Sequence, residues 1–370
     1  MSDLLLPTIR RWMEIETPSH DHQAVARLIR LVQEDAQAAG LRSQSLDLGT
    51  QAAPLLMVSN RSAEDARAGI VVLTHLDTVH PVGSLERNPI RIEGDRVYGP
   101  GGYDMKAGAC IALQALKDVS AHGGSTLPVD MLFVPDEEIG SASSRPEIER
   151  LAQGARYALV AEPARAHGKC VTARKGIGEL RLGAYGCAAH AGLQHERGRN
   201  AIRELAHQIL ALEAMTQYER GITVNVGRIA GGTATNVVPE QASLQGEFRT
   251  PTMALASEVM QRLQSLQPCT PDVRLDVQCR LKRPPFERTA ASALLLEQAQ
   301  RLAAEAGVDL QEAPMTGGGS DGNFTAAMGI ATLDGLGVCG DGAHTHNEYF
   351  LLSSLQPRLA FWSRLLCALQ

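Results

Sequence analysis

Three apolar segments in the first half of the chain each run directly into a histidine or an acidic residue. They are 69–79 (GIVVLTHLDTV), 128–138 (PVDMLFVPDEE) and 157–163 (YALVAEP). Such short continuous apolar runs are typical of buried strands, and helical patterns lie among them. Strands that alternate with helices predict a mostly parallel sheet with helices on both faces. In such sheets the chemistry collects beyond the carboxyl ends of the strands, which is where these polar residues lie.

A second pattern begins near residue 175 and interrupts the first. Its segments follow the order β-α-β-β-α-β, which is typical of a split-βαβ, ferredoxin-like unit. We therefore predict an α/β domain of residues 1–174 and 285–370 and an inserted α+β domain of residues 175–284. The predicted helices are 4–16, 22–39, 104–119, 198–214, 253–266, 290–307 and 353–369, and the further strands are 176–186, 222–230, 241–249, 273–281 and 330–336.

The composition is that of a globular protein and excludes several classes of function. Of the 370 residues, 44% are hydrophobic and 21% are charged, and a chain of this length exceeds one ordinary core. The net charge of −6 argues against a nucleic-acid partner, because phosphate binding needs clustered basic residues. The sequence has neither a signal-peptide pattern nor an apolar stretch long enough to span a membrane. The seven scattered cysteines form no C-x-x-C pair, so we expect reduced core thiols in a cytoplasmic protein.

The first two candidate site segments contribute a histidine and two aspartates. His75 and Asp77 lie two residues apart at a strand end, so their side chains point to one face. Such a carboxylate can orient a metal-binding imidazole, although a strand-end histidine with one hydrogen bond produces the same triplet. Asp104 follows the Gly/Pro-rich turn in YGPGGYDMKAG (98–108) and begins a helix. There it caps the helix, bridges two metals with its two oxygens, or does both.

The remaining segments contribute glutamates and another histidine. Glu137 and Glu138 are adjacent at the end of the second strand, where they repel each other unless a cation or a proton intervenes. In extended chain one of them can bind a metal while the other faces a water molecule; a solvated acidic turn is the alternative. Glu162 follows the third strand, and His344 lies near the end of the chain. Taken singly, each of these residues is more often structural than functional.

As a set, these residues meet the requirements of a two-metal site. Nitrogen and carboxylate ligands without thiolates suit zinc, with cobalt or manganese as substitutes. Two divalent ions ~3.5–4 Å apart need about four terminal ligands and one bridging carboxylate. Five residues fill that list and leave Glu137 as a general base. The five are His75, Asp104, Glu138, Glu162 and His344.

The motifs also resemble those of a known family. HLDTV, YGPGGYDMKAG, DEEIGS, AEP, HAG (190–192) and H-T-x-x-E (344–348) occur in that order along nearly the whole chain. They resemble the di-zinc aminoacylase/carboxypeptidase family of metallopeptidases, and the nearest branch is that of the glutamate carboxypeptidases.

The resemblance implies a role for each residue of the site. It implies that His75 and Glu162 bind one zinc ion, and that Glu138 and His344 bind the other. It further implies a bridging role for Asp104, with a cis peptide bond between Asp104 and Met105. Finally, it implies that Asp77 orients His75 and that Glu137 is the general base.

For the inserted domain, the resemblance implies a lid that also forms a homodimer. His190 matches a histidine that stabilises the oxyanion, often from the partner subunit, and Asn236 matches an asparagine that contacts substrate. Arg249 matches an arginine that grips the substrate carboxylate, and its alternative is a surface arginine at a strand end. The loop TGGGSDGN (316–323), which includes Gly318, resembles a glycine-rich loop near the substrate; its alternative is an ordinary turn.

Four further positions lie in or beside these motifs. Gly102 replaces a small apolar residue of the family pattern, and we interpret it as added flexibility beside the site. His346 offers an alternative to His344, which fits the family pattern better. We expect His80 at the rim of the site. Arg283, in KRPPF, either adds positive charge near an acidic substrate or is a hinge residue.

The implied reaction is hydrolysis of an amide bond next to a free carboxylate in a small N-acyl amino acid or peptide. Release of a C-terminal amino acid, as by a glutamate carboxypeptidase, ranks first and an N-acyl-amino-acid deacylase second. A dipeptidase ranks third, because no residue is evident for the free α-amino end. A non-catalytic binding protein on the same fold is a remote alternative, which the presence of Glu137 disfavours. A further alternative is a purely structural oligomer, but such a protein would not need the complete set of metal ligands that this sequence contains.

Overall fold

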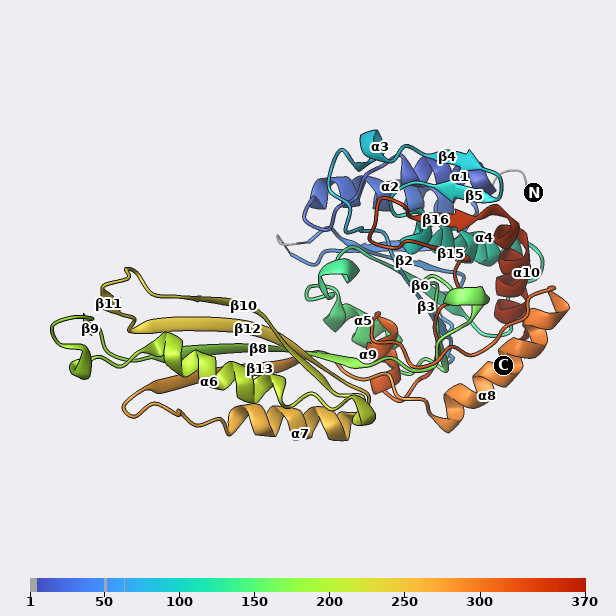
Figure 1. Ribbon diagram of the computed structural model, residues 1–370. Coiled ribbons are helices and arrows are strands. Elements are labelled where there is room, and N and C mark those ends of the chain that lie inside the picture. The colour runs from blue at the N-terminus through green and yellow to red at the C-terminus, as the bar shows by residue number, and fades with distance from the viewer. Residues whose placement is uncertain (1–4, 50–51, 63) are drawn as a thin grey trace. The chain divides into compact units, whose positions relative to one another are not determined.

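The structure is a computed structural model that describes residues 5–49, 52–62 and 64–370, and the chain forms two compact units (Figure 1). The first unit comprises Met1–Ala173, Arg288–Thr316 and Ser320–Gln370, within those described residues. The second comprises Arg174–Glu287 together with Gly317–Gly319.

A six-stranded sheet in the order β1-β2-β6-β3-β7-β14 forms the centre of the first unit. The last four strands pair in parallel, whereas β1 and β2 are antiparallel to their neighbours. This confirms the prediction of a mostly parallel sheet. The β1–β2 edge was not predicted, since β1 reads RSQSL and has no apolar run. The strands are β1 (Arg42–Leu46), β2 (Leu55–Ser59), β3 (Ile70–His75), β6 (Val129–Val134), β7 (Tyr157–Val160) and β14 (Ala331–Leu333).

Alternate side chains of this sheet enter two different hydrophobic cores. On β3, Ile70 and Val72 belong to the larger core, whereas Val71 and Leu73 belong to the smaller core on the opposite face. Both faces of the sheet are therefore covered by helices, as predicted. The larger core is lined by α1 (Leu5–Met13), α2 (His22–Ala38), α4 (Ala107–Ala121), α8 (Ala290–Glu305) and α10 (Leu352–Ala368), and the smaller by α5 (Arg145–Ala152) and α9 (Gly322–Ala327).

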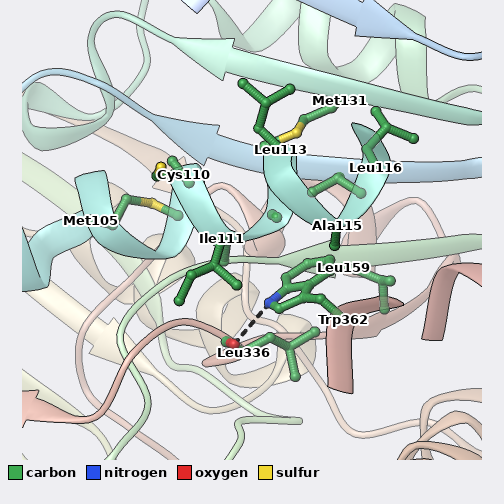
Figure 2. Close-up of a cluster of buried hydrophobic side chains, with 14 of the residues drawn as sticks. Met105, Cys110, Ile111, Leu113, Ala115, Leu116, Met131, Leu159, Leu336 and Trp362 are labelled. Carbon is green, nitrogen blue, oxygen red and sulfur yellow. Dashed lines mark hydrogen bonds between the residues drawn. The ribbon is translucent and has the colours of Figure 1, made fainter. Parts of the chain in front are cut away.

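The larger core holds α4 in place through a buried tryptophan. Figure 2 shows Trp362 of α10 beside Ile111 and Ala115 of α4. The ring is fully buried, and its Nε1 donates a hydrogen bond to the carbonyl of Leu336 at 3.0 Å. Since α4 directly follows the turn that contains Asp104, this packing also fixes one side of the site.

A small second sheet of the first unit, in the order β15-β16-β5-β4, pairs segments that are distant in the sequence. It brings the chain just before Asp104 next to the chain just after His344, because β5 pairs with β16. No motif predicted this sheet. Its strands are β4 (Arg91–Glu93), β5 (Arg96–Tyr98), β15 (Gly340–Asp341) and β16 (Tyr349–Leu351), and the short helix α3 (Ser84–Arg87) precedes them.

The second unit is an antiparallel sheet in the order β10-β12-β8-β13 with two helices. The observed sequence of elements is the predicted β-α-β-β-α-β, and its own hydrophobic core lies between sheet and helices. A separate two-stranded pair, β9 and β11, lies at one end of this sheet (Figure 1). The elements are β8 (Gly176–Tyr185), β9 (Ala189–His190), α6 (Ala201–Glu213), β10 (Thr223–Gly231), β11 (Val237–Val238), β12 (Gln241–Thr250), α7 (Met253–Gln264) and β13 (Arg274–Arg283).

The cysteines are all free thiols, but most of them are not in the core. Cys110 and Cys170 are buried, and burial raises the pKa of each thiol to about 12. Cys187, Cys269 and Cys367 are exposed, so the expectation of core thiols was wrong for them. Within the part of the chain that the structure describes, no helix is both long and apolar enough to cross a membrane.

Candidate metal centre

Four of the predicted residues lie at or just beyond strand ends of the first unit, close to one another. His75 is the last residue of β3, and Glu162 lies two residues beyond the end of β7. Glu137 and Glu138 follow β6 in a short 3-10 turn, Glu137–Ile139, rather than in the extended chain that we expected. Because β3, β6 and β7 run parallel, these residues lie at the same edge of the sheet.

The two carboxylate oxygens of Asp104 face two different histidines. Oδ1 lies 3.3 Å from Nε2 of His75, and Oδ2 lies 3.2 Å from Nε2 of His344. Each histidine also lies near a glutamate. His75 Nε2 lies 3.7 Å from Oε1 of Glu162, and His344 Nε2 lies 3.2 Å from Oε2 of Glu138. The five predicted ligands therefore form two imidazole–carboxylate groups that share Asp104.

Glu137 lies beside the first of these groups. Single donor atoms of His75, Glu137 and Glu162 lie within 4.8 Å of one another, as do those of His75, Asp104 and Glu138. The structure therefore brings Glu137 close enough to act on a molecule bound there, or to serve as a further ligand.

Asp77 supports both a histidine and the acidic turn. His75 Nδ1 lies 2.9 Å from the Asp77 carbonyl oxygen and 3.5 Å from its carboxylate. The same carboxylate accepts hydrogen bonds from the backbone amides of Glu137 and Glu138, both at 3.1 Å, and from the hydroxyl of Ser19 at 2.6 Å. Asp77 therefore contacts the acidic turn and Ser19 in addition to the predicted imidazole, and no motif pointed to Ser19.

The turn at Asp104 differs from the predicted helix start. The residue at the N-cap position of α4 is Lys106, without a side-chain cap, so Asp104 does not cap the helix. The peptide bond between Asp104 and Met105 is cis, as the resemblance implied. A Cβ on Gly102 would lie 2.7 Å from Met13 Cε and 3.3 Å from Phe350 Cδ1, so this buried glycine allows both side chains to pack closely against the turn. The added flexibility stays a prediction.

The predicted residues of the second unit lie in two separate places: His190 and Asn236 in one, and Arg249 in the other. His190 pairs with Val237 across β9 and β11, and the Ala191 amide bonds to the Asn236 carbonyl at 2.9 Å. Arg249 lies eight residues beyond Gln241, the start of β12. At about 3.3 Å per residue that separation is about 26 Å along the strand.

Near the far end of β12, Arg249 forms a hydrogen bond with the glycine-rich loop. Arg249 donates from Nη1 to the Gly317 carbonyl at 2.5 Å and from Nε to Glu247 at 2.8 Å. Arg174 donates to the carbonyl of Gly318 at 3.1 Å. Arg283 is buried beside Gly319, where a Cβ would lie 2.8 Å from its Cδ. The loop therefore lies among three guanidinium groups.

The profile of peptidase family M20/M25/M40 matches residues 71–368, which is most of the chain. The chain belongs to this family. It is a hydrolytic metallopeptidase, since members of the M20/M25/M40 family include carboxypeptidases and desuccinylases related to it.

Individual members of the family match nearly end to end. Carboxypeptidase G2 of Pseudomonas sp. (strain RS-16) is 28% identical over 370 residues, which cover 98% of this chain and 88% of that protein. Succinyl-diaminopimelate desuccinylase of Bordetella petrii is 29% identical over 357 residues, which cover 91% and 90%.

Solved structures of the family have the same fold. A tripeptidase from Staphylococcus aureus superposes with a TM-score of 0.79 at 20% identity, covering 99% of this chain and 98% of the other. An M20 family metallo-carboxypeptidase from Sulfolobus solfataricus gives 0.77 at 18% identity, covering 98% of each chain.

Enzymes of the M20/M25/M40 family typically depend on two metal ions, and the charges at the cluster in this chain fit such ions. Burial opposes a charge on His75, but hydrogen bonds to Asp104 and Asp77 outweigh it and hold its pKa well above the usual range. Hydrogen bonds to Asp104 and then to Glu138 raise the pKa of His344 to about 10. The carboxylates therefore stabilise positive charge within the cluster. That charge can be carried by protons on the histidines or by bound metal cations.

His346 and His80, which were predicted beside the site and not as its preferred ligands, have different surroundings. His346 is exposed, without a contact to the cluster among the described residues, whereas His344 meets two carboxylates. His80 is not at the rim: it is buried, with Nε2 2.6 Å from the carboxylate of Glu348. Glu348 is the last residue of H-T-x-x-E, so the motif contained this signal although we assigned the residue no role.

Proposed function

We propose that this chain is a di-zinc amidohydrolase that cleaves an amide bond next to a free carboxylate and releases a C-terminal amino acid such as glutamate. The observation that carries the proposal is the arrangement around Asp104, whose two oxygens face two histidines that each meet a different glutamate. A single ion needs no such doubled set, whereas two ions with a shared carboxylate do.

In this proposal His75 and Glu162 hold one ion, Glu138 and His344 hold the other, and Asp104 belongs to both. The donors are nitrogen and carboxylate oxygen without thiolates, which suits zinc, with cobalt or manganese as substitutes. When bound, two such cations polarise the scissile carbonyl and make a nearby water molecule acidic at neutral pH.

Glu137 is the proposed general base. It accepts a proton from the attacking water and passes it to the nitrogen of the leaving amine. Its place near His75 and Glu162 supports this role, because a base has to reach the reacting atoms. The hydrogen bond from its amide to Asp77 limits the movement of its backbone.

His190 is the proposed donor to the oxyanion that forms as the carbonyl is attacked. Its Nδ1 accepts hydrogen bonds from the amides of Gly192 and Leu193, both at 3.2 Å. The proton of the neutral ring therefore resides on Nε2, which leaves an N–H to donate. His190 itself is exposed, and Asn236 directly precedes the neighbouring strand β11, where it can contact the same substrate.

Arg249 and the loop around Gly318 are proposed to bind the substrate carboxylate. A guanidinium can hold a carboxylate through two parallel hydrogen bonds and so fix the position of the amide bond. The nearby guanidinium groups of Arg174 and Arg283 add positive charge at the loop, which supports a substrate with an acidic amino acid at its end.

The second unit is proposed to act as a lid and to form a homodimer. Arg249 lies about 26 Å along β12 from Gln241, and His190 lies near the Gln241 end, where β9 pairs with β11 (Val237–Val238) just before β12 begins. This separation is too large for both residues of one chain to touch one small substrate. If both act on it, one of them has to come from a second copy. The proposed source is His190 of a partner subunit, in an isologous dimer.

A metal-supplemented hydrolysis screen tests the proposed function. The panel contains acyl-glutamates, acyl-aspartates, neutral N-acyl amino acids and dipeptides, each with zinc or cobalt. We expect the acyl-glutamates and acyl-aspartates to be cleaved fastest. Preference for neutral N-acyl amino acids supports instead a deacylase, a candidate that the match to a desuccinylase favours. Absence of turnover on every acyl amino acid contradicts both.

A further inference from the structure

The carboxylate of Glu348 is fully buried and binds a turn that is distant in the sequence. Its Oε1 accepts hydrogen bonds from the backbone amides of Tyr103 at 2.9 Å and Asp104 at 3.0 Å. Its Oε2 accepts one from the amide of Gly101 at 2.9 Å. Glu348 therefore binds three amides of the turn that presents the Asp104 carboxylate.

The turn requires an acceptor from elsewhere because its own geometry is not that of a regular helix. Asp104 has φ −114° and ψ 94°, and Met105 has φ −131° and ψ 28°. A buried amide that finds no acceptor destabilises the fold, because it loses its hydrogen bond to water without a replacement. A carboxylate offers about four lone-pair sites, so a single glutamate can satisfy all three amides and a further donor.

That further donor is His80. Its Nε2 lies 2.6 Å from Oε2 of Glu348, and both side chains are buried. His80 lies five residues after His75, and Glu348 lies four residues after His344. The pair therefore ties together the three chain segments that carry His75, Asp104 and His344.

We propose that Glu348 and His80 are positioning residues that hold Asp104 between His75 and His344 at the spacing that two cations require. The inference rests on the proposed function, because it takes Asp104 as the shared ligand. Since Glu348 has no exposed surface, it acts through the turn and not on the substrate. Groups that orient metal ligands typically change metal affinity 10–100-fold when they are mutated.

The test is a titration of metal-free protein with Co²⁺, comparing the wild type with Glu348→Gln. The amide keeps the size of the side chain but replaces one acceptor oxygen with an NH₂ group, which faces N–H donors. We expect cobalt to bind roughly 10–100-fold more weakly, with a changed visible absorption spectrum, and we expect kcat to fall more than KM rises. Thermal stability is measured in parallel.

The matched control is Glu305→Gln, which removes an exposed carboxylate that pairs with Arg364 at 2.7 Å. It should bind cobalt as the wild type does. A second pair of variants keeps the test usable if Glu348→Gln does not fold. His80→Gln retains a donor near the position of Nε2 and should weaken cobalt binding less than His80→Ala.

The outcomes separate positioning from general stability. If Glu348→Gln only lowers thermal stability and keeps the cobalt affinity and spectrum of the wild type, the inference is wrong. It is equally wrong if Glu348→Gln does not fold and both His80 variants bind cobalt like the wild type. If the wild type itself binds no cobalt, the proposed metal site fails and the inference fails with it.

Discussion

At the residue scale, the proposed role of Glu137 as a base that binds no metal can be tested by separating metal binding from catalysis. We expect Glu137→Gln to lower kcat by about 10²–10⁴-fold, because the amide cannot accept the proton of the attacking water. The metal content should remain that of the wild type. Both quantities are measurable, by initial rates and by elemental analysis of the purified protein.

The control for this variant is Glu149→Gln, which removes a partly exposed carboxylate that pairs with Arg145 at 2.8 Å on α5. Its activity should match the wild type. Glu137 lies within reach of His75 and Glu162, so a loss of bound metal in Glu137→Gln would identify it as a ligand. Undiminished activity would exclude it as the base.

The raised pKa of His344 predicts a pH dependence for the proposed metal site. Hydrogen bonds to Asp104 and Glu138 raise its pKa from 6.5 to about 10. Between these values the folded metal-free protein keeps a proton that the unfolded chain loses. The resulting stabilisation is complete below the unfolded pKa and is lost as the pH rises through about 10.

A metal ion has to displace this proton, so the apparent zinc affinity of metal-free protein should increase with pH across the same range. Calorimetric titrations in buffers of different ionisation enthalpy measure the protons released. His344→Ala should release fewer protons than the wild type. A zinc affinity that does not vary with pH would contradict the proposed role of His344.

At the scale of elements, α10 packs on α4, the helix that follows the turn containing Asp104. Trp362→Ala should lower the free energy of unfolding by about 3–5 kcal/mol, because it opens a cavity in the larger core. It also leaves the Leu336 carbonyl without its hydrogen bond from the indole. Urea unfolding of the metal-free protein measures the loss.

Gln356→Ala provides the comparison, since Gln356 is exposed on the same helix and its loss should change stability by no more than about 0.5 kcal/mol. Trp362→Phe should fall between the two variants. A cost below about 1 kcal/mol for Trp362→Ala would mean that α10 contributes little to the core.

At the scale of the whole molecule, the proposed dimer makes each active site depend on two chains. Glu137→Gln and His190→Ala should each be nearly inactive alone. Mixed dimers of the two variants combine an intact Glu137 with an intact His190 in one of their two sites. Random exchange should therefore restore roughly a quarter of the wild-type activity.

Size measurement of the mixture and of each variant confirms that dimers form and exchange. Recovery of activity only in the mixture supports a histidine supplied by the partner. If dimers exchange and the activity does not recover, His190 does not act from the partner. If the protein is a monomer with full activity, the proposed dimer is wrong.

The sequence by itself determined the fold class and which histidines and carboxylates approach one another in the first unit. Both depend on local patterns: buried strands leave apolar runs, and parallel strands bring the residues at their carboxyl ends to one edge. For this reason the placement of His75, Glu138 and Glu162 at one edge of the sheet was predictable from the strand ends, although only the whole set predicted a metal site. The small sheet that joins β5 to β16 left no such pattern, because its strands are only three residues long.

Only the tertiary structure decided how the ligands are held. The bond from the Asp104 amide to Glu348 joins residues 244 positions apart, and that from His80 joins residues 268 positions apart. Neither follows from periodicity or spacing, because a hydrogen bond between distant segments depends on the whole sheet being formed. The same is true of the separation between His190 and Arg249, which are 59 residues apart in the sequence and are held apart by the length of β12.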